Sequence, residues 1–441
     1  SLSGGEAYEG LSNAGEMGTN LIIVVNDNEM SIAENHGGLY QNLKELRDTE
    51  GRSSCNFFRS LGLDYLYVGE GNDIPSLVAA FAKVKDTSRP TVVHIHTQKG
   101  KGYAPAEADR EEFHWEMPFD LETGKPKVDC SGMEDYHSLT GKFLLEKMKE
   151  DHTVVAISSG TPTVIGFTPE RRKQAGRQFV DVGIAEEHAV ALASGIAAGG
   201  GRPVYGVYST FIQRCYDQLS QDLCINGNPA VITVFMGTVA GMNDVTHLGF
   251  FDIPLISNIP NMVYLAPTCS EEYFAMLEWA VRQTEYPVAI RVPGVAVVHR
   301  KEEFDTDYSE LNRYKMTARG ETVAILALGS FYDLGQALKN KLREESGVEA
   351  TLINPRYITG LDEPMLEELK VGHRIVVTLE DGVLDGGFGE KIARYYGNSE
   401  MRVLNYGLRK EFADRYNLDE LMKANRLTDK QMAEDIAGIL E

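Results

Sequence analysis

Amide and carboxylate side chains follow directly on the first apolar run of the sequence. The run Leu21–Val25 is succeeded by Asn26, Asp27, Asn28 and Glu29. Ligands of parallel sheets gather at the carboxyl ends of strands, and side-chain oxygens suit Mg²⁺. An Asx-rich turn would show the same residue types. Taken alone, this segment is therefore compatible with a metal site and with an ordinary turn.

A second segment, Asp181–Ala189, places two acids and a histidine at the beginning of a predicted helix. These residues are Glu186, Glu187 and His188. Acids in a first helical turn usually lie on the surface, where the helix dipole favours them. A glutamate buried against a neutral nitrogen heterocycle would instead hold its proton until the ring shares it, because desolvation raises the pKa of a carboxyl group. Both interpretations stay open at this point.

Three further segments combine residue types that chemistry could use, and each also has an ordinary structural explanation. The aromatic residues at both ends of Tyr208–Gln218 could bracket a planar ring, although such a stripe is more often part of a core. His247 lies in a loop next to Gly249. The run His96–Glu107, with His114 close behind, carries basic and glycine residues that suit either an anion or a plain surface turn.

The elements that must position these residues are predicted from the hydrophobic pattern. Short runs rich in β-branched residues recur along the chain, and each is followed by a stretch long enough for a helix. This alternation indicates parallel sheets covered on both faces by helices, so the predicted fold class is α/β. The predicted strands include Leu21–Val25, Thr91–His96, Ala230–Phe235, Val288–Val292, Thr322–Leu328, Ala350–Ile353, Arg374–Leu379 and Met401–Leu404.

Two polar stretches divide the 441 residues into three predicted domains. Residues 119–132 and 299–320 have the composition of linkers, with breakers or many charged residues. The predicted domains are therefore residues 1–125, 126–305 and 306–441. In the last of them no pattern suggests chemistry, and Asp385–Gly389 is expected to be a tight turn that opens a helix.

The charge of the chain narrows the classes of partner. Lys and Arg number 43 against 65 Asp and Glu, which gives a formal net charge of -22. A surface this acidic repels phosphate backbones and anionic membranes, so neither nucleic acid nor a membrane is an expected partner.

We also find no signal peptide and no apolar run of membrane-spanning length. The scattered cysteines are expected to be reduced thiols of a cytoplasmic protein; they are Cys55, Cys130, Cys215, Cys224 and Cys269.

The order of these segments along the chain is more specific than any one of them. The chain resembles the 1-deoxy-D-xylulose-5-phosphate synthase family of the transketolase superfamily, over essentially its whole length. The most specific strings are Gly-Lys-Gly-Tyr-Ala-Pro-Ala-Glu, at residues 100–107, and Tyr-Ser-Thr-Phe-Ile-Gln-Arg, at residues 208–214. The remaining matching stretches are residues 1–7, Asn26–Ser31, Ala185–His188, Thr246–His247, Phe251–Ile253 and Ile259–Pro267.

The resemblance implies an enzyme that depends on thiamine diphosphate and Mg²⁺. It implies a homodimer of three α/β domains, of which the first binds the diphosphate and Mg²⁺, the second binds the aminopyrimidine, and the third is structural. The implied reaction takes a two-carbon unit from pyruvate, releases carbon dioxide, and joins the unit to the aldehyde D-glyceraldehyde 3-phosphate. The product, 1-deoxy-D-xylulose 5-phosphate, would serve isoprenoid and thiamine biosynthesis in the cytoplasm.

The resemblance also implies roles for individual residues. Glu186 matches the glutamate that hydrogen-bonds the pyrimidine ring nitrogen and so activates the cofactor, and Phe211 would stack on the pyrimidine, with Ile184 beside it. The side chain of Asn28 and the carbonyl of Met30 would be Mg²⁺ ligands. The substrate side would be lined by Tyr208, Arg214, Asn243, His247 and His114, with the two histidines as candidates for proton transfer.

The sequence departs from the family pattern in two places. It begins where a Gly-Asp-Gly triplet should just have ended, so the Mg²⁺-binding aspartate of that triplet is not among these residues, and we expect this chain to bind the cofactor weakly. Met236 and Gly294 stand where the family has arginines that hold the acceptor phosphate, and Asn243 stands for an aspartate. Arg214 and Arg291 are the nearby cations that could rebuild the phosphate site. A relative with a different acceptor and a non-catalytic paralogue are the alternatives.

Overall fold

The computed structural model describes residues 2–128, 132–294 and 296–440, and their strands form three sheets. The sheets have three, six and five strands, and helices connect most of the strands, which confirms the predicted α/β class. The chain divides into two compact units, each described below by itself. The first consists of Ser1–Met133, Ser158–Pro162 and Asp181–Glu186, and the second of the remaining residues.

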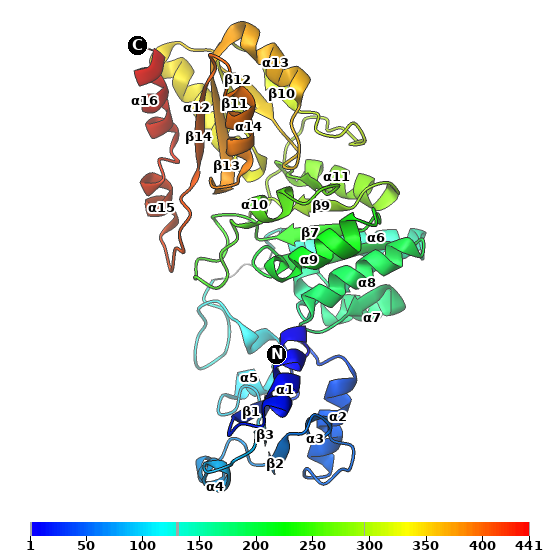
Figure 1. The fold of residues 1–441 in the computed structure, drawn as a ribbon. Coiled ribbons are helices and arrows are strands. Elements are labelled where there is room, and N and C mark those ends of the chain that lie inside the picture. Colours follow the sequence, from blue (N-terminus) through cyan, green and yellow to red (C-terminus); the bar gives the residue numbers. More distant parts are fainter. Residues whose placement is uncertain (1, 129–131, 295, 441) are drawn as a thin grey trace. The chain divides into compact units, whose positions relative to one another are not determined.

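The three-stranded sheet of the first unit has the order β1-β3-β2, and its strands run parallel. Alternate residues of β3 face opposite sides: Val92 packs with helices α1 to α3, whereas Val93 and Ile95 pack with α4 (Figure 1). The elements are α1 (Gly5–Met17), β1 (Ile22–Asp27), α2 (Gly38–Asp48), α3 (Phe57–Ser60), β2 (Asp64–Val68), α4 (Ile74–Val84), β3 (Thr91–His96) and α5 (Ala104–Ala108).

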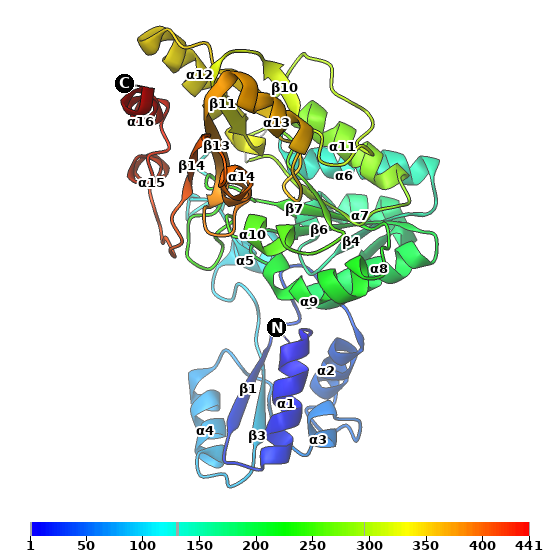
Figure 2. The same cartoon turned by 45° about the horizontal axis from the view of Figure 1, so that its top comes forward.

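The six-stranded sheet of the second unit has the order β5-β4-β6-β7-β9-β8. The pairs from β4 to β8 are parallel, and α6 and α11 lie on one side of the sheet with α8 and α9 on the other (Figure 2). The elements are α6 (Tyr136–Glu150), β4 (Val154–Ser158), α7 (Pro169–Ala175), β5 (Phe179–Asp181), α8 (Glu186–Ala198), β6 (Arg202–Tyr208), α9 (Tyr216–Gln218), β7 (Val231–Phe235), α10 (Asp252–Ser257), β8 (Val263–Leu265), α11 (Ser270–Arg282) and β9 (Val288–Arg291).

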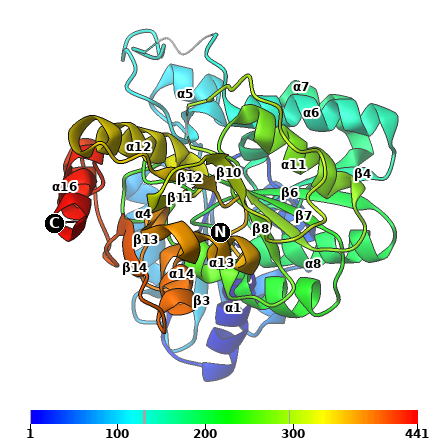
Figure 3. The same ribbon diagram turned by 90° about the horizontal axis from the view of Figure 1, so that it is seen from above.

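The five-stranded sheet, also in the second unit, has the order β10-β12-β11-β13-β14, and only β10 runs antiparallel. Helices α12 and α16 pack on one side of it, and α13 and α14 lie on the other (Figure 3). The elements are β10 (Lys315–Ala318), β11 (Thr322–Ala327), α12 (Tyr332–Ser346), β12 (Thr351–Asn354), α13 (Glu363–Gly372), β13 (His373–Val383), α14 (Phe388–Tyr396), β14 (Arg402–Leu408), α15 (Leu418–Ala424) and α16 (Asp429–Leu440).

The turn before α14 confirms the structural interpretation of its glycines. The buried carboxylate of Glu380 accepts hydrogen bonds from the backbone N–H groups of Phe388 (2.7 Å) and Gly389 (2.7 Å). These are donors of the first helical turn, which have no partner within the helix. A phosphate has no place at this helix start, because a carboxylate of the chain already occupies it.

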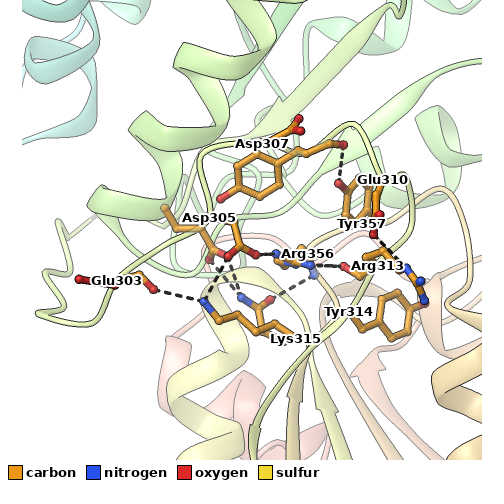
Figure 4. A network of polar contacts seen from close by, with 12 residues as sticks. Glu303, Asp305, Asp307, Glu310, Arg313, Tyr314, Lys315, Arg356 and Tyr357 are labelled. Atoms are coloured by element: carbon orange, nitrogen blue, oxygen red, sulfur yellow. Dashed lines mark hydrogen bonds and ion pairs between the residues drawn. The ribbon is translucent and has the colours of Figure 1, made fainter.

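The polar stretch that precedes the five-stranded sheet is held in place by one arginine. Arg356 donates to the carbonyl of Arg313 through Nε (3.0 Å) and Nη2 (2.6 Å), and it forms an ion pair with Asp305 (Figure 4). Lys315 donates to the carbonyl of Glu303 at 3.2 Å. The predicted linker, residues 299–320, is thus an ordered segment whose end forms β10 of the five-stranded sheet, and the domain boundaries themselves stay a prediction.

Four of the five cysteines fall within the described residues, and all four are free thiols. Cys130 lies outside the described residues. Across the part of the chain that the structure covers, none of the helices has both the length and the apolar character needed to cross a bilayer.

Arg291, at the end of β9, is the centre of a buried polar network in the second unit. Its Nε and Nη2 atoms donate to Asp252 at 2.7 Å and 3.2 Å, and Nη2 also donates to the carbonyl of Asp381 at 2.5 Å. The Tyr264 hydroxyl donates to the same carboxylate of Asp252. Burial disfavours the charge, but Asp252 and Asp381 outweigh it and raise the pKa of Arg291 above its ordinary value. The network therefore joins the six-stranded sheet to β13 of the five-stranded sheet.

Replacing Arg291 with Met should lower the free energy of unfolding by about 3–5 kcal/mol, because the change leaves the Asp252 carboxylate buried without its cation. Arg282→Met is the matched control, since Arg282 is 76% exposed and lies 3.7 Å from Glu278. An exposed pair of this kind is worth only about 0–1 kcal/mol. Urea denaturation of both variants tests the prediction, and equal losses of stability would contradict it.

Candidate active site

The loop after β1 begins on a buried carboxylate. Asp27 forms an ion pair with Arg47 and accepts a hydrogen bond from His94 Nε2 at 3.0 Å, and its Oδ1 accepts from the backbone N–H of Glu29 at 3.1 Å. Burial would raise the pKa of Asp27, but the bonds from His94 and Arg47 prevail and lower it to about 2. The Tyr65 hydroxyl lies 2.6 Å from Nδ1 of the same histidine. Asp27 is therefore a fixed anion that shapes the loop.

The predicted metal ligands follow in this loop. Asn28 Oδ1 accepts from the backbone N–H of Met30 at 3.1 Å, and Glu29 between them has φ of 63°, in the left-handed region. Lys99 Nζ donates to the carbonyls of Ser31 (3.0 Å) and Ile32 (3.2 Å), which closes the far side of the loop. The loop thus has the Asx geometry of an ordinary turn and still presents amide and carbonyl oxygens.

The donor set of this loop fits Mg²⁺ only in part. The Asn28 side chain and the Met30 carbonyl are neutral oxygens, the type of ligand that Mg²⁺ accepts, but this ion prefers six oxygens and at least one carboxylate. Within the described residues, no group of three His, Cys, Asp or Glu side chains is placed to hold a metal ion. The assignment of Asn28 and Met30 as metal ligands stays a prediction.

Glu186 is placed by a tight turn between β5 and α8. Asp181 Oδ1 accepts from the N–H groups of Gly160 and Gly183, both at 2.8 Å, and Gly183 has φ of 73°. The turn ends at Glu186, the first residue of α8, whose side chain is only 3% exposed. Its neighbours Glu187 and His188 are more exposed. The structure therefore favours the buried carboxylate over a surface acid for Glu186 alone.

A row of four rings lies at the carboxyl ends of β6 and β7. The ring of His137 stacks on Phe235 (centroids 4.8 Å apart) and meets Tyr208 edge-on at 6.2 Å. Phe211 lies 5.7 Å from Tyr208. Burial lowers the pKa of His137 and favours its neutral form. The predicted pair Tyr208 and Phe211 is thus brought together, and the sequence analysis missed the buried histidine that supports it.

The ring row continues to His247 from the loop after β7. The imidazole meets Phe211 edge-on, with ring centroids 5.7 Å apart, and its Nδ1 lies 2.9 Å from Asp244 Oδ1. Hydrogen bonds from Thr246 and His247 lower the pKa of Asp244 to about 2. Asp244 was not predicted as a site residue, although its position three residues before a loop histidine was the available signal. The pair fixes Nδ1 as a donor and leaves Nε2 for a substrate.

The environment of the ring row fits a planar heterocycle. Ser209, between the two aromatic positions, is 1% exposed, and its hydroxyl has no hydrogen-bond partner within the described residues. Burying an unpaired hydroxyl costs free energy. Tyr208 and Phe211 are only partly buried, so their faces are the part of the row against which a planar heterocycle such as an aminopyrimidine can pack.

The polar side chains expected to bind the acceptor have partners within the protein. Arg214 lies 3.2 Å from Glu187, and the amide of Asn243 donates to the carbonyl of Tyr416 at 3.0 Å. Arg291 is 4% exposed and bound to Asp252, so the expectation that it could rebuild a phosphate site is wrong. Its Nε and Nη2 atoms are bound to Asp252 and to the carbonyls of Asp381 and Gly249, and its side chain is buried, so Arg291 is placed as a structural residue.

The predicted site residues fall into both units. Asn28, Met30 and His114 belong to the first unit, together with Ile184 and Glu186 from the turn before α8. The second unit brings together the ring row and the loop with its histidine. Partial desolvation and the charge of Lys99 lower the pKa of His114, so it is predominantly neutral near pH 7.

Three families match successive parts of the chain. The family described as 1-deoxy-D-xylulose-5-phosphate synthase matches residues 1–56. The transketolase pyrimidine binding domain matches residues 134–297, and the transketolase C-terminal domain matches residues 313–432.

The curated relatives are similar over nearly all of this chain. The 1-deoxy-D-xylulose-5-phosphate synthase of Lachnoclostridium phytofermentans is 33% identical over 97% of the chain and 75% of its own length. The enzyme of the same name from Clostridium tetani is 33% identical over 100% of the chain and 76% of its own length. The chain thus spans about three quarters of the length of these relatives.

Solved structures of transketolases share the fold. A split-gene transketolase, described as an inactive β4 tetramer, has a TM-score of 0.58 at 20% identity and covers 70% of this chain and 98% of its own. Transketolase from Pichia stipitis in complex with sedoheptulose 7-phosphate has a TM-score of 0.57 at 15% identity and covers 99% of this chain and 74% of its own. At these identities the likeness concerns the fold alone.

Asp27→Asn should make the stability of the protein less dependent on acid. The pKa of Asp27 is about 2 when folded and about 3.9 when unfolded, so its ionised form contributes roughly 2–3 kcal/mol above pH 4. That contribution disappears as the pH falls through the folded pKa. The difference in unfolding free energy between the wild type and this variant should therefore shrink between about pH 4 and pH 2. Urea unfolding across this range measures it, with the exposed Asp86→Asn as control; a gap independent of pH would contradict it.

Proposed function

Because the chain belongs to the 1-deoxy-D-xylulose-5-phosphate synthase family, we propose that it transfers a two-carbon unit from pyruvate to an aldehyde, releases carbon dioxide, and depends on thiamine diphosphate and Mg²⁺. The family makes it a transferase of the transketolase type. With D-glyceraldehyde 3-phosphate as acceptor the product is 1-deoxy-D-xylulose 5-phosphate, a precursor for isoprenoids and thiamine. We propose a cytoplasmic homodimer as its working form.

The buried carboxylate of Glu186 is the observation that carries this proposal. Bound thiamine diphosphate would supply a nucleophilic carbon able to attack a 2-oxo acid. Glu186 would hold a proton at its carboxyl group and share it with a pyrimidine ring nitrogen, a contact that is strong only where water is excluded. A side chain that is 3% exposed meets that condition. Phe211 and Tyr208 would pack against the ring, and Asn28 with the Met30 carbonyl would hold Mg²⁺.

His247 is suited to the acceptor half of the reaction. When an aldehyde accepts a carbon nucleophile, its oxygen gains charge and needs a proton. As an imidazolium, His247 can deliver one from Nε2, because Asp244 accepts a hydrogen bond from Nδ1 at 2.9 Å and fixes the orientation of the ring. A non-catalytic paralogue would need neither this pair nor a buried Glu186, so both observations favour an enzyme.

A second candidate function, with another aldehyde as acceptor, is favoured by the missing phosphate cations. Neither Met236 nor Gly294 bears a cation, although the family pattern has an arginine at each of these positions. Arg291 is bound to Asp252, and Arg214 faces Glu187. We therefore propose that D-glyceraldehyde 3-phosphate is bound weakly or replaced by another aldehyde.

Glu186→Gln in the full-length protein should slow the release of carbon dioxide from pyruvate by about 10²-fold or more, since the amide cannot share a proton with the ring. Thiamine diphosphate should still bind, as calorimetry would show. The exposed Glu146→Gln serves as control and should leave both quantities unchanged. Decarboxylation by Glu186→Gln at the wild-type rate would contradict the assignment.

The acceptor preference should show in a coupled assay with pyruvate and a panel of phosphorylated and free aldehydes. We expect a high Michaelis constant for D-glyceraldehyde 3-phosphate, and a constant in the low micromolar range would contradict this. Met236→Arg combined with Gly294→Arg should lower that constant by about 10–10³-fold, because each charge-assisted bond contributes about 1.5–3 kcal/mol before strain is subtracted. Val371→Arg, at a position 91% exposed in the third domain, controls for added charge.

A further inference from the structure

We propose that the third domain positions His247 for the acceptor reaction, so that Asp381, Asp414 and Tyr416 are positioning residues rather than parts of an inert scaffold. The inference rests on the proposed function, since it takes His247 as the group that serves the aldehyde. It concerns the loop Met236–Phe250, here called the histidine loop, which leaves β7 of the six-stranded sheet and returns before α10.

The base of the histidine loop is buried in the core of the third domain. Val239, Leu248 and Phe250 are at most 2% exposed, and they belong to the apolar cluster formed by the five-stranded sheet and its helices. The two ends of the loop also touch, because a side chain at Gly249 would meet the Met236 carbonyl at 1.8 Å. The two ends of the loop therefore contact each other, and its buried apolar side chains pack in the core of the third domain.

Asp381 fixes the base by hydrogen bonds. Its Oδ1 accepts from the backbone N–H of Val239 at 2.7 Å, and its Oδ2 accepts from the Ser330 hydroxyl at 2.6 Å. Arg291 donates to the Asp381 carbonyl at 2.5 Å and to the Gly249 carbonyl at 3.4 Å. One carboxylate and one guanidinium thus anchor the loop at both of its ends, in surroundings from which water is excluded.

The tip of the histidine loop is held by a second segment of the third domain, residues 412–416. Asp414 Oδ1 accepts from the N–H of Val245 at 3.1 Å, and the N–H of Arg415 donates to the carbonyl of Asn243 at 2.6 Å. The Tyr416 hydroxyl donates to the carbonyl of Val239 at 2.7 Å. The first two bonds fall on Val245 and Asn243, directly after and before Asp244, and the third holds Val239 at the base of the loop.

The position of His247 depends on these contacts through Asp244. Asp244 orients the imidazole, and its two neighbours in sequence, Asn243 and Val245, are hydrogen-bonded to the third domain. A shift of the segment 412–416 would move the carboxylate and the imidazole together. Reactions that need proton delivery at a fixed atom lose rate steeply with small misplacements. The decarboxylation of pyruvate alone does not use His247 in the proposed function, so it should not depend on this segment.

The test uses Asp414→Ala and Tyr416→Phe in the full-length protein, singly and combined. The combined variant should lose about tenfold or more in kcat/KM for the aldehyde, because the imidazole of His247 is then no longer held at one position. Release of carbon dioxide without an aldehyde should change less than about twofold. Asp414→Asn keeps an acceptor oxygen and should restore most of the loss. Glu411→Ala, an exposed acid of the same region, is the matched control.

Amide hydrogen exchange provides a readout that does not require turnover. In the combined variant the amides of the histidine loop should exchange about tenfold faster, while those of α8 keep the wild-type rate. The inference is overturned if loop exchange is unchanged, if kcat/KM for the aldehyde is unchanged, or if both half-reactions fall together. A wild type that releases no carbon dioxide would overturn the proposed function instead, and loop exchange would still decide whether the third domain holds the loop.

Discussion

The buried ion pair between Arg291 and Asp252 is the interaction on which the arrangement of the second unit depends. The guanidinium is 4% exposed and the carboxylate 0% exposed, so each charge is tolerated only because the other is present. The same guanidinium reaches the backbone of Asp381, a residue of the third domain. Because a buried charge needs partners, this guanidinium fixes the end of β9 against β13, and it also donates to the carbonyl of Gly249 in the loop that carries His247.

This use of Arg291 has a chemical consequence. An arginine at the end of a central parallel strand is well placed to bind an anionic substrate, because ligands gather at that edge of such sheets. Here its Nε and Nη2 atoms donate hydrogen bonds to the carboxylate of Asp252 and to the carbonyls of Asp381 and Gly249. Met236 and Gly294 carry no charge. In the proposed function, the acceptor would therefore be recognised by fewer cations than the family pattern provides.

The sequence predicted the α/β class and eight strands, because those strands are continuous apolar runs. It did not name β2, β4, β5, β6, β8 or β10; of these, β6 contains Pro203 and Gly206, and β5 and β8 have only three residues each. Tyr208, Phe211 and His247, which were predicted from their motifs, lie next to one another, and their roles stay predictions. Asp244 and His137 were missed, since their partners lie in the folded structure and not in a motif. The view of the third domain as only structural also came from the absence of a motif, and contacts between distant segments have no local signature.

The most direct test of this account is a double-mutant cycle on Arg291 and Asp252, with Arg291→Met and Asp252→Leu measured singly and together by chemical denaturation. Each single variant leaves one buried charge without its partner, whereas the double variant leaves none. We predict a coupling free energy of about 2 kcal/mol or more, with the double variant clearly more stable than the sum of the single losses implies. Additive losses would show that the two residues do not stabilise each other, and would contradict the account.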